Sequence, residues 1–290
     1  MKNELNFWVV GGDMRQAKLA ELLADDGHTV HTFALERLGR LEEVEAEPDL
    51  AGAGLADCVV LPLPAVGEGS LLNAPLSSGS HPMAEVLDAL RPGQVVCAGM
   101  VGGELEALAA RRGLVLHDYF RREELAVANA VPTAEGALQI AMEELPVTVH
   151  GARVLVVGYG RLGRLLAHRL SGLGARVSVA ARKYADLAWI EAFGYGVEHT
   201  GQLEGWLCGY DLIVNTVPAR VLDAAALAEL KPGCLVIDLA SKPGGVDFDA
   251  AARLGVRAIW ALSLPGKVAP VTAGRSIRTV IYNILQELGV

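Results

Sequence analysis

Cysteine is scarce in this sequence, and long apolar runs are missing. The four cysteines lie far apart, with no CxxC spacing and no paired histidines, which argues against a zinc site and a disulfide framework. We expect them to be buried, reduced thiols, and we expect no metal. Gly, Pro or a charged residue interrupts every apolar stretch before it reaches the roughly 18 residues that a membrane span requires. The first residues also lack a secretory signal pattern, so we expect a cytoplasmic protein with no membrane partner.

Basic residues are scarce in the first half of the chain. Residues 1–150 hold 10 Lys and Arg against 23 Asp and Glu, a net charge of −13, whereas residues 151–290 hold 15 against 11, a net charge of +4. The acidic first half argues against nucleic acid as a partner. The mildly basic second half suits a polyanionic small ligand such as a phosphorylated dinucleotide, although solvated surface charge would give the same totals.

The chain has 290 residues, of which 52% are hydrophobic, and this is enough for two packed domains. In each half, short β-branched runs alternate with helical stretches, the pattern of parallel strands joined by crossover helices. The runs of the first half are 7–10, 29–33, 58–61, 95–98 and 114–116. Those of the second half are 153–157, 176–181, 212–216, 235–239 and 257–260. The sequence therefore predicts an α/β fold of two Rossmann-like, doubly wound parallel-sheet domains joined by linker helices.

Two further helices are predicted outside these sheets. One covers 133–145, after Pro132, and the other covers 277–288, because apolar residues recur there at helical spacing. The predicted parts are an N-terminal substrate or partner domain at 1–131, a linker helix at 132–150, a dinucleotide-binding domain at 151–272, and a helix at 273–290 that returns to the first domain. The Gly-, Ser- and Pro-rich segment 62–82 is either a substrate loop or a plain surface loop.

A glycine-rich loop carries the main functional signal. The predicted strand 154–157 runs into Gly158, Gly160 and Gly163, with Arg161 and Leu162 opening an amphipathic helix. In a dinucleotide site the first glycine permits a tight turn, the second lets the backbone approach the pyrophosphate, and the third lets helix and strand pack closely. The free N–H groups of the helix start then bind the phosphates. The alternative is a glycine-rich turn without a ligand.

The end of the next strand indicates which dinucleotide binds. NAD enzymes usually place Asp or Glu there to hold the ribose 2′-OH, but this strand ends in Arg182 and Lys183. Two cations would bind the 2′-phosphate of NADP, and the missing carboxylate removes the repulsion that normally rejects it. The sequence therefore predicts NADP, with a solvated basic turn as the alternative.

Three later segments follow strands and are expected to line the same cofactor groove. They are 216–218 with Thr216, Val217 and Pro218, 240–245 starting at Ala240, and 264–267 starting at Leu264 and Pro265.

Several short motifs, spread over nearly the whole chain, match one family. They are Val10-Gly11-Gly12-Asp13 with Arg15-Gln16, Asn129 with Pro132-Thr133-Ala134-Glu135-Gly136, Gly158 to Gly163, Asp238-Leu239-Ala240-Ser241 with Pro243-Gly244-Gly245, Leu264-Pro265-Gly266, and Ala269-Pro270 with Thr272-Ala273-Gly274. On these motifs the chain resembles the A-subunit family of dipicolinate synthase. Lys242 departs from the pattern, because it stands where this family leads us to expect Arg, and it keeps the charge without the bidentate fork.

The resemblance implies an NADP-dependent enzyme of sporulation, located in the cytoplasm of the mother cell. With a flavoprotein-like B subunit, such an enzyme oxidises dihydrodipicolinate, derived from 4-hydroxytetrahydrodipicolinate, to dipicolinate. A ring C–H delivers hydride to the nicotinamide, a base removes the accompanying proton, and aromatisation supplies driving force. We also expect a homo-oligomer that binds a small dicarboxylate and no nucleic acid.

A dicarboxylate substrate requires cationic or neutral donors, which we expect in a cleft between the domains. The candidate substrate-binding residues are Arg15, Arg122, Thr133, Ser241, Lys242 and Thr272. For proton transfer, Glu135 is the first candidate and Asp13 the second, because each lies in a family-like motif. Both have plainer interpretations: Glu135 stabilises the first turn of a helix, and Asp13 pairs with Arg15.

Three other functions compete with this interpretation. A 2-hydroxy acid dehydrogenase shares the glycine loop but normally needs a late histidine as acid and base, and no histidine follows His199. An enzyme of the alanine dehydrogenase type would place its catalytic groups in the first domain, and amino-acid substrates would test it. A non-catalytic NADP-binding scaffold would keep the phosphate loop without turnover.

Overall fold

The computed structural model describes residues 4–290, so the signal-peptide prediction lies partly outside the described residues. The chain divides into two compact units. Unit one comprises the residues up to Asn129 together with Ala269–Val290, and unit two comprises Ala130–Val268. The predicted borders at 131 and 272 lie close to this division. No helix within 4–290 is long and apolar enough to cross a membrane.

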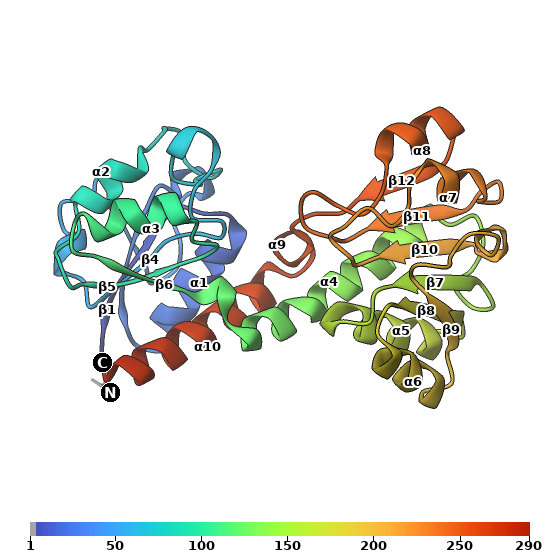
Figure 1. Ribbon diagram of the computed structural model, residues 1–290. Helices are drawn as coiled ribbons and strands as arrows, with labels where there is room; N and C mark the ends of the chain where they lie inside the picture. Colours follow the sequence, from blue (N-terminus) through green and yellow to red (C-terminus); the bar gives the residue numbers. More distant parts are fainter. Residues whose placement is uncertain (1–3) are drawn as a thin grey trace. The chain divides into compact units, whose positions relative to one another are not determined.

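Unit one contains a six-stranded parallel sheet in the order β3-β2-β1-β4-β5-β6. Its strands are β1 Asn6–Val10, β2 Thr29–Phe33, β3 Glu45–Ala46, β4 Cys58–Val60, β5 Val95–Ala98 and β6 Val115–Asp118. Its helices are α1 Met14–Asp25, α2 Met83–Asp88, α3 Gly103–Ala110 and α10 Pro270–Leu288. Residues of α1 and α10 pack on one face of the sheet and those of α2 and α3 on the other, so both faces are buried (Figure 1).

Unit two repeats this topology in the order β12-β11-β10-β7-β8-β9, again all parallel. Its strands are β7 Arg153–Val157, β8 Arg176–Ala181, β9 Gly196–His199, β10 Leu212–Asn215, β11 Leu235–Asp238 and β12 Arg257–Trp260. Its helices are α5 Arg161–Gly172, α6 Tyr184–Ala192, α7 Ala224–Ala228, α8 Phe248–Leu254 and α9 Leu264–Val268. Figure 1 shows α5 and α6 on one face of this sheet and α7 and α8 on the other.

The predicted linker helix at 132–150 is corrected by the structure. Helix α4 runs from Glu123 to Glu144 and contains Pro132 in its interior, so the division between the units falls inside it. Proline is common in the first turn of a helix, where its missing N–H is harmless, so Pro132 by itself suggests a helix start. The acidic pair Glu123 and Glu124 is the actual start signal, since carboxylates stabilise the amino end of a helix.

The C-terminal helix α10 begins at Pro270, earlier than the apolar period at 277 suggests, with the proline in its first turn. It runs beside α1, and its buried residues Ile277, Ile281 and Ile284 share a core with Leu19 and Leu23 of α1. Gly274 allows the close approach: a Cβ there would lie 3.0 Å from the carbonyl oxygen of Arg15. The start of α10 therefore lies against the first turn of α1.

The segment 62–82 is folded onto the turn that follows β1. The N–H of Gly12 donates to the carbonyl oxygen of Asn73 at 2.8 Å, and the Asn73 side chain donates to the Pro64 carbonyl at 3.0 Å. Leu72 is buried beneath Gly11. Glu36 binds the hydroxyl groups of Ser77 and Ser78, each at 2.8 Å, and so ties the far end of the segment to the same unit.

Candidate cofactor and substrate sites

The glycine loop of unit two has the geometry of a dinucleotide-binding turn. Gly158 follows β7 with a φ of 103°, which L side chains rarely adopt, and its N–H donates to the carbonyl of Ala180 at 2.8 Å. A Cβ on Gly158 would overlap the hydroxyl of Thr216, and one on Gly163 would overlap the carbonyl oxygen of Gly158. The chain itself therefore requires glycine at both positions.

Gly160 differs from these two glycines. Its φ of −80° suits any residue, and a Cβ there would meet no protein atom within 4 Å. It caps the N-terminus of α5, whose first turn carries no acidic residue and whose cap makes no side-chain hydrogen bond. Neither the backbone nor the packing calls for glycine at 160. An anionic ligand lying against the N–H groups at the start of α5 would require glycine at 160, because a side chain there would occupy its space. The loop therefore fits the pyrophosphate of a dinucleotide.

The strand register brings the other predicted cofactor segments to the same edge. Val157 is level with Ala180 on one side and with Asn215 on the other, and Asn215 is level with Asp238. The segments at 182–183, 216–218 and 240–245 therefore leave the carboxyl edge beside the glycine loop. The strand order runs outward from β7 to β9 on one side of the sheet and from β10 to β12 on the other. Ligands of doubly wound folds bind at such a switch point, which here lies between β7 and β10.

Arg182 and Lys183 follow the last residue of β8 and are both exposed. Neither forms an ion pair within residues 4–290. The nearest acidic residue along the chain, Asp186, is 3.5 Å from the guanidinium of Arg164. The end of β8 thus presents two cations and no competing carboxylate of its own.

The segments after β10, β11 and β12 contribute unequally to this edge. Thr216 is half-buried and donates to the Val157 carbonyl at 2.9 Å, while Ser241 and Lys242 are exposed at the tip of their loop. The prediction that Leu264 lines the cofactor groove is corrected. Its side chain is buried in the core and packs on Gly136 of α4. Its neighbour Pro265 is half-buried.

In unit one, Asp13 and Arg15 form a single ion pair. The Arg15 guanidinium binds both Asp13 carboxylate oxygens, at 2.9 and 2.8 Å, and its Nη2 also donates to the Leu63 carbonyl at 2.5 Å. Asp13 additionally caps α1 by accepting from the Arg15 N–H. The pair therefore ties the turn after β1 to the segment after β4, the plainer role considered for it. Thr272 lies in the first turn of α10, two residues before Gly274, whose backbone packs against that of Arg15.

The structure does not bring Arg122 to these residues. Its guanidinium binds Glu287 at 2.9 Å and also pairs with Glu124. These hydrogen bonds raise the pKa of Arg122 and lower that of Glu287. Glu287 lies near the end of α10, about 22 Å along the helix from Thr272 at 1.5 Å per residue. The substrate-binding prediction for Arg122 is corrected to a pairing that holds the end of α10.

Glu135 also lies away from the glycine loop. Its exposed carboxylate is 3.4 Å from Nη2 of Arg169 on α5. Arg169 is about 12 Å along α5 from Arg161, where the phosphate-binding end of the helix begins. Thr133, half-buried on α4, lies two residues before Glu135. The placement of Glu135 in mid-helix beside a basic partner argues against its predicted role as general base.

Sequence reasoning missed two residues under the cofactor edge. Asn215 and Asp238 end β10 and β11, and both have no exposed surface. Their sequence signal was a polar residue closing an otherwise apolar strand, which is unusual in a sheet buried on both faces.

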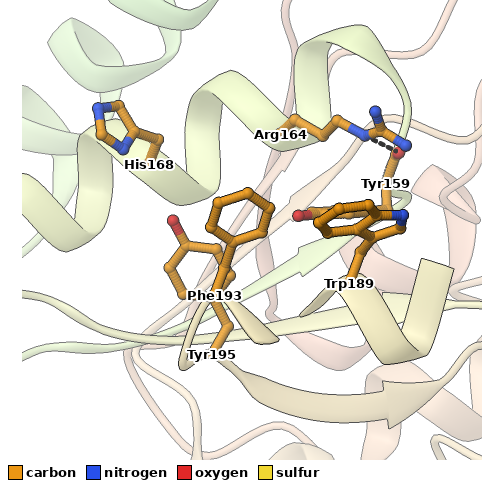
Figure 2. Close-up of a pocket in the computed structure, with 6 residues that line it drawn as sticks. All are labelled: Tyr159, Arg164, His168, Trp189, Phe193 and Tyr195. Carbon is orange, nitrogen blue, oxygen red and sulfur yellow. Dashed lines mark hydrogen bonds between the residues drawn. The ribbon is translucent and has the colours of Figure 1, made fainter. Parts of the chain in front are cut away.

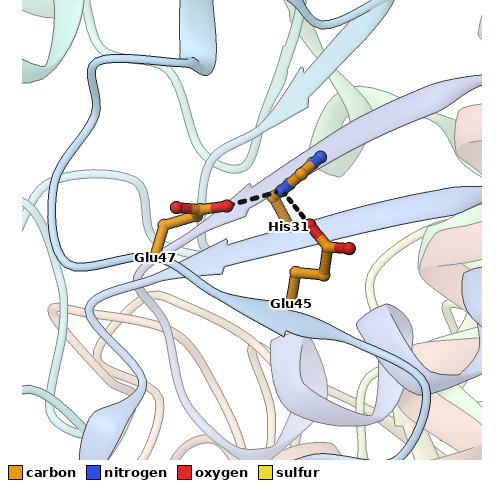
Figure 3. A group of neighbouring side chains, drawn as sticks. All are labelled: His31, Glu45 and Glu47. Atoms are coloured by element: carbon orange, nitrogen blue, oxygen red, sulfur yellow. Dashed lines mark hydrogen bonds and ion pairs between the residues drawn. The ribbon is translucent and has the colours of Figure 1, made fainter.

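Two other clusters lie away from this edge. An apolar hollow of about 330 Å³ is lined by Tyr159, Arg164, His168, Trp189, Phe193 and Tyr195, most of them on or beside α5 and α6. Figure 2 shows these six side chains. In unit one, His31 lies between Glu47 at 2.8 Å and Glu45 at 3.3 Å (Figure 3). Hydrogen bonding between the imidazole and Glu47 accounts for this arrangement, so we propose no metal site from it.

The family of the chain follows from its relatives. Residues 6–120 match the N-terminal domain of the dipicolinate synthase A subunit, and residues 118–250 match "D-isomer specific 2-hydroxyacid dehydrogenase, NAD binding domain". The A subunit of dipicolinate synthase from Bacillus subtilis is 33% identical over 99% of this chain and 98% of its own length. The chain belongs to the A-subunit family of dipicolinate synthase. Its second unit is an NAD(P)-binding dehydrogenase domain.

Solved structures agree with this assignment. The dipicolinate synthase A subunit from Bacillus halodurans superimposes with a TM-score of 0.88, at 32% identity, over 97% of both chains. A transhydrogenase from Sinorhizobium meliloti shares the fold at 18% identity, with a TM-score of 0.73 over 97% of this chain and 94% of its own. The predicted fold of two Rossmann-like parallel-sheet domains is confirmed.

Proposed function

We propose that this member of the dipicolinate synthase A-subunit family is an NADP-dependent oxidoreductase that oxidises dihydrodipicolinate, derived from 4-hydroxytetrahydrodipicolinate, to dipicolinate. The observation that carries the choice of cofactor is the exposed pair Arg182 and Lys183, which ends β8 where an acidic residue would select NAD. The family supplies the substrate class.

The cofactor half of the proposed site belongs to unit two. The N–H groups at the start of α5 bind the pyrophosphate beside Gly160, and the two cations hold the 2′-phosphate. The reaction transfers a ring hydride from the substrate to the nicotinamide and releases one proton, which yields dipicolinate, NADPH and H⁺. The task of the chain is then to orient the ring, exclude water and accept the proton.

Each unit holds candidate substrate contacts of its own. In unit two, Lys242 and Ser241 stand at the tip of the loop after β11, and Lys242 forms no ion pair within residues 4–290. In unit one, Thr272 is exposed in the first turn of α10, and the Arg15 guanidinium is already engaged by Asp13 and Leu63. Lys242 is therefore the leading partner for a substrate carboxylate.

Of the two candidate bases, position favours Asp13. It follows β1 at the carboxyl edge of the first sheet, where doubly wound domains bind ligands, whereas Glu135 projects beside the second half of α5. Proton transfer requires Asp13 to act from within its pair with Arg15.

We further propose that the chain works in the cytoplasm of the mother cell of a spore-forming bacterium, as a homo-oligomer and with a flavoprotein-like B subunit. These parts of the proposal are supported by the family assignment alone.

The test combines the full chain with NADP and a source of hydroxytetrahydrodipicolinate, with and without the B subunit of the same organism. NADPH absorbance and dipicolinate formation are followed together. Both signals are expected, in equal amounts. NADP binding without either signal in any combination would contradict the reaction and favour a non-catalytic scaffold, and turnover of amino acids instead would favour an enzyme of the alanine dehydrogenase type.

A further inference from the structure

Two fully buried polar side chains lie under the proposed cofactor edge and contact each other. The Nδ2 of Asn215, at the end of β10, donates to Oδ1 of Asp238, at the end of β11, at 2.8 Å. Both residues have no exposed surface, so neither is placed to touch a bound ligand directly. A role for them has to act through the loops that they hold.

Asp238 closes the loop that carries Ser241 and Lys242. Its Oδ1 also accepts from the N–H of Ala240 at 3.0 Å, and its Oδ2 accepts from the N–H of Gly245 at 2.7 Å. All three donors are neutral, and two of them flank the exposed tip of the loop. A buried carboxylate is costly unless hydrogen bonds replace those it made to water, so the loop has to supply these donors at fixed positions.

Asn215 fixes the neighbouring loop in the same way. Its Oδ1 accepts from the N–H of Val217 at 3.1 Å, and its Nδ2 donates to the carbonyl of Val217 at 3.0 Å as well as to Asp238. The side chain thereby sets the conformation of the segment that carries Thr216 and Val217. The contact between Asn215 and Asp238 joins the two loops to each other.

The glycine pair of the second loop is explained by this contact. Gly244 has a φ of 83°, and a Cβ on it would lie 3.0 Å from Oδ2 of Asp238. A Cβ on Gly245 would overlap Nδ2 of Asn215. The loop therefore closes directly onto the two buried side chains, while the indole N–H of Trp260 donates to the Ala240 carbonyl at 2.9 Å from the next strand.

We propose that Asp238 and Asn215 are positioning residues that set the two loops beneath the nicotinamide half of the cofactor. This inference rests on the proposed function. The glycine loop and the end of β8 serve the pyrophosphate and the adenosine, so the loops after β10 and β11, on the other side of the switch point, face the remaining half. Asp238 and Asn215 then act on hydride transfer through Ser241, Lys242 and Val217.

The test compares two ligands that share the adenosine end. Adenosine 2′,5′-bisphosphate probes the end held by α5 and Arg182, whereas NADP probes both halves. In Asp238→Asn, one acceptor oxygen becomes an NH₂ group facing an N–H donor. We expect the affinity of the full chain for the bisphosphate to stay within about twofold, that for NADP to fall about tenfold, and kcat to fall by about a hundredfold, the scale of an ångström misplacement.

Asp211→Asn is the matched control, because it makes the same chemical change at the amino end of β10. Asp211 accepts from the Arg153 N–H and from Lys231, so its loss lowers stability at the far edge of the same sheet. Its affinities and kcat are expected to stay at the wild-type values. If Asp238→Asn does not fold, the same measurements are made on Asn215→Ser, which removes the hydrogen bond from Asn215 to Asp238 without adding a charge.

The outcomes separate this inference from the proposed function. If the wild-type chain binds NADP and the folded variants lose affinity for both ligands equally, or keep both affinities and kcat, the positioning role is overturned. If the wild-type chain binds neither ligand, the proposed cofactor is wrong and the inference falls with it. If the wild-type chain binds NADP without turnover and the variants weaken NADP selectively, the positioning role stands while the proposed reaction does not.

Discussion

Gly163 of α5 lies so close to Gly158 of the preceding turn that a Cβ on Gly163 would overlap the carbonyl oxygen of Gly158. Helix and strand therefore lie too close together for any side chain at position 163. This contact fixes the direction of α5, and with it the direction of the free N–H groups at its start. The same loop contains a third glycine, Gly160, that no such contact requires.

Gly163→Ala is expected to destabilise unit two. The methyl group has no room against backbone atoms, so α5 has to move, and overpacking of this kind costs about 1–3 kcal/mol. Thermal unfolding of the full chain, followed by circular dichroism, measures the effect. An unchanged unfolding temperature would contradict the packing described here.

Gly160→Ala is expected to lower stability by less than about 1 kcal/mol, because alanine is a poorer N-cap than glycine, and to weaken dinucleotide binding at least tenfold, or by about 1.4 kcal/mol. A methyl group at 160 meets no protein atom but enters the region assigned to the pyrophosphate. Calorimetric titration with NADP measures the affinity, and thermal unfolding of the same variant measures the stability. Normal binding by this variant would show that the phosphates lie elsewhere.

Replacement of Arg182 and Lys183 by Asp and Ser is expected to reverse the cofactor preference. The affinity for NADP should fall about a hundredfold, because two charge-assisted contacts of roughly 1.5–3 kcal/mol each are lost, with some of the loss screened by solvent. The affinity for NAD should change much less. Titrations of both dinucleotides at one salt concentration decide the matter, and equal losses would refute the assignment of the 2′-phosphate.

Glu36→Gln is expected to alter the pH dependence of stability. Burial tends to raise the pKa of Glu36, but hydrogen bonds from the Ser78 N–H and from the Ser77 and Ser78 hydroxyls outweigh it and lower the pKa from 4.5 to about 2. A carboxylate with a lowered folded-state pKa stabilises the protein above its ordinary pKa and loses that contribution as the pH falls.

The wild-type unfolding temperature should therefore drop more between pH 4.5 and pH 2 than that of Glu36→Gln, and the variant should be less stable at pH 7. Glu42→Gln, at an exposed glutamate without an ion pair in residues 4–290, is the control. Parallel curves for the wild type and Glu36→Gln would mean that Glu36 does not hold the segment 62–82.

Part of the candidate site could be predicted because its signals are local. The glycine spacing at 158–163 and the basic end of the next strand are readable from a few adjacent residues, and the structure places them at one edge. Their roles in cofactor and substrate binding stay predictions. The site roles predicted for Arg122 and Glu135 rest on their nearness to a motif along the chain, and both side chains bind partners on other helices instead.

The sequence by itself determined the fold class and the position of the dinucleotide loop. Short β-branched runs and glycine spacings express backbone preferences that act within a few residues, so they can be read without knowing what packs against them. The start of α4 at Glu123 was not predicted from local patterns, because Pro132 suggests a start but lies inside the helix.

Only the tertiary structure decided that Asn215 and Asp238 meet. They are 23 residues apart, and the parallel register of β10 and β11 sets their ends side by side. The tertiary structure also decided that Arg15, paired with Asp13, binds the segment after β4, and that α10 lies along α1. Contacts between distant segments depend on which strands pair and which helices cover them, and no local pattern specifies that choice.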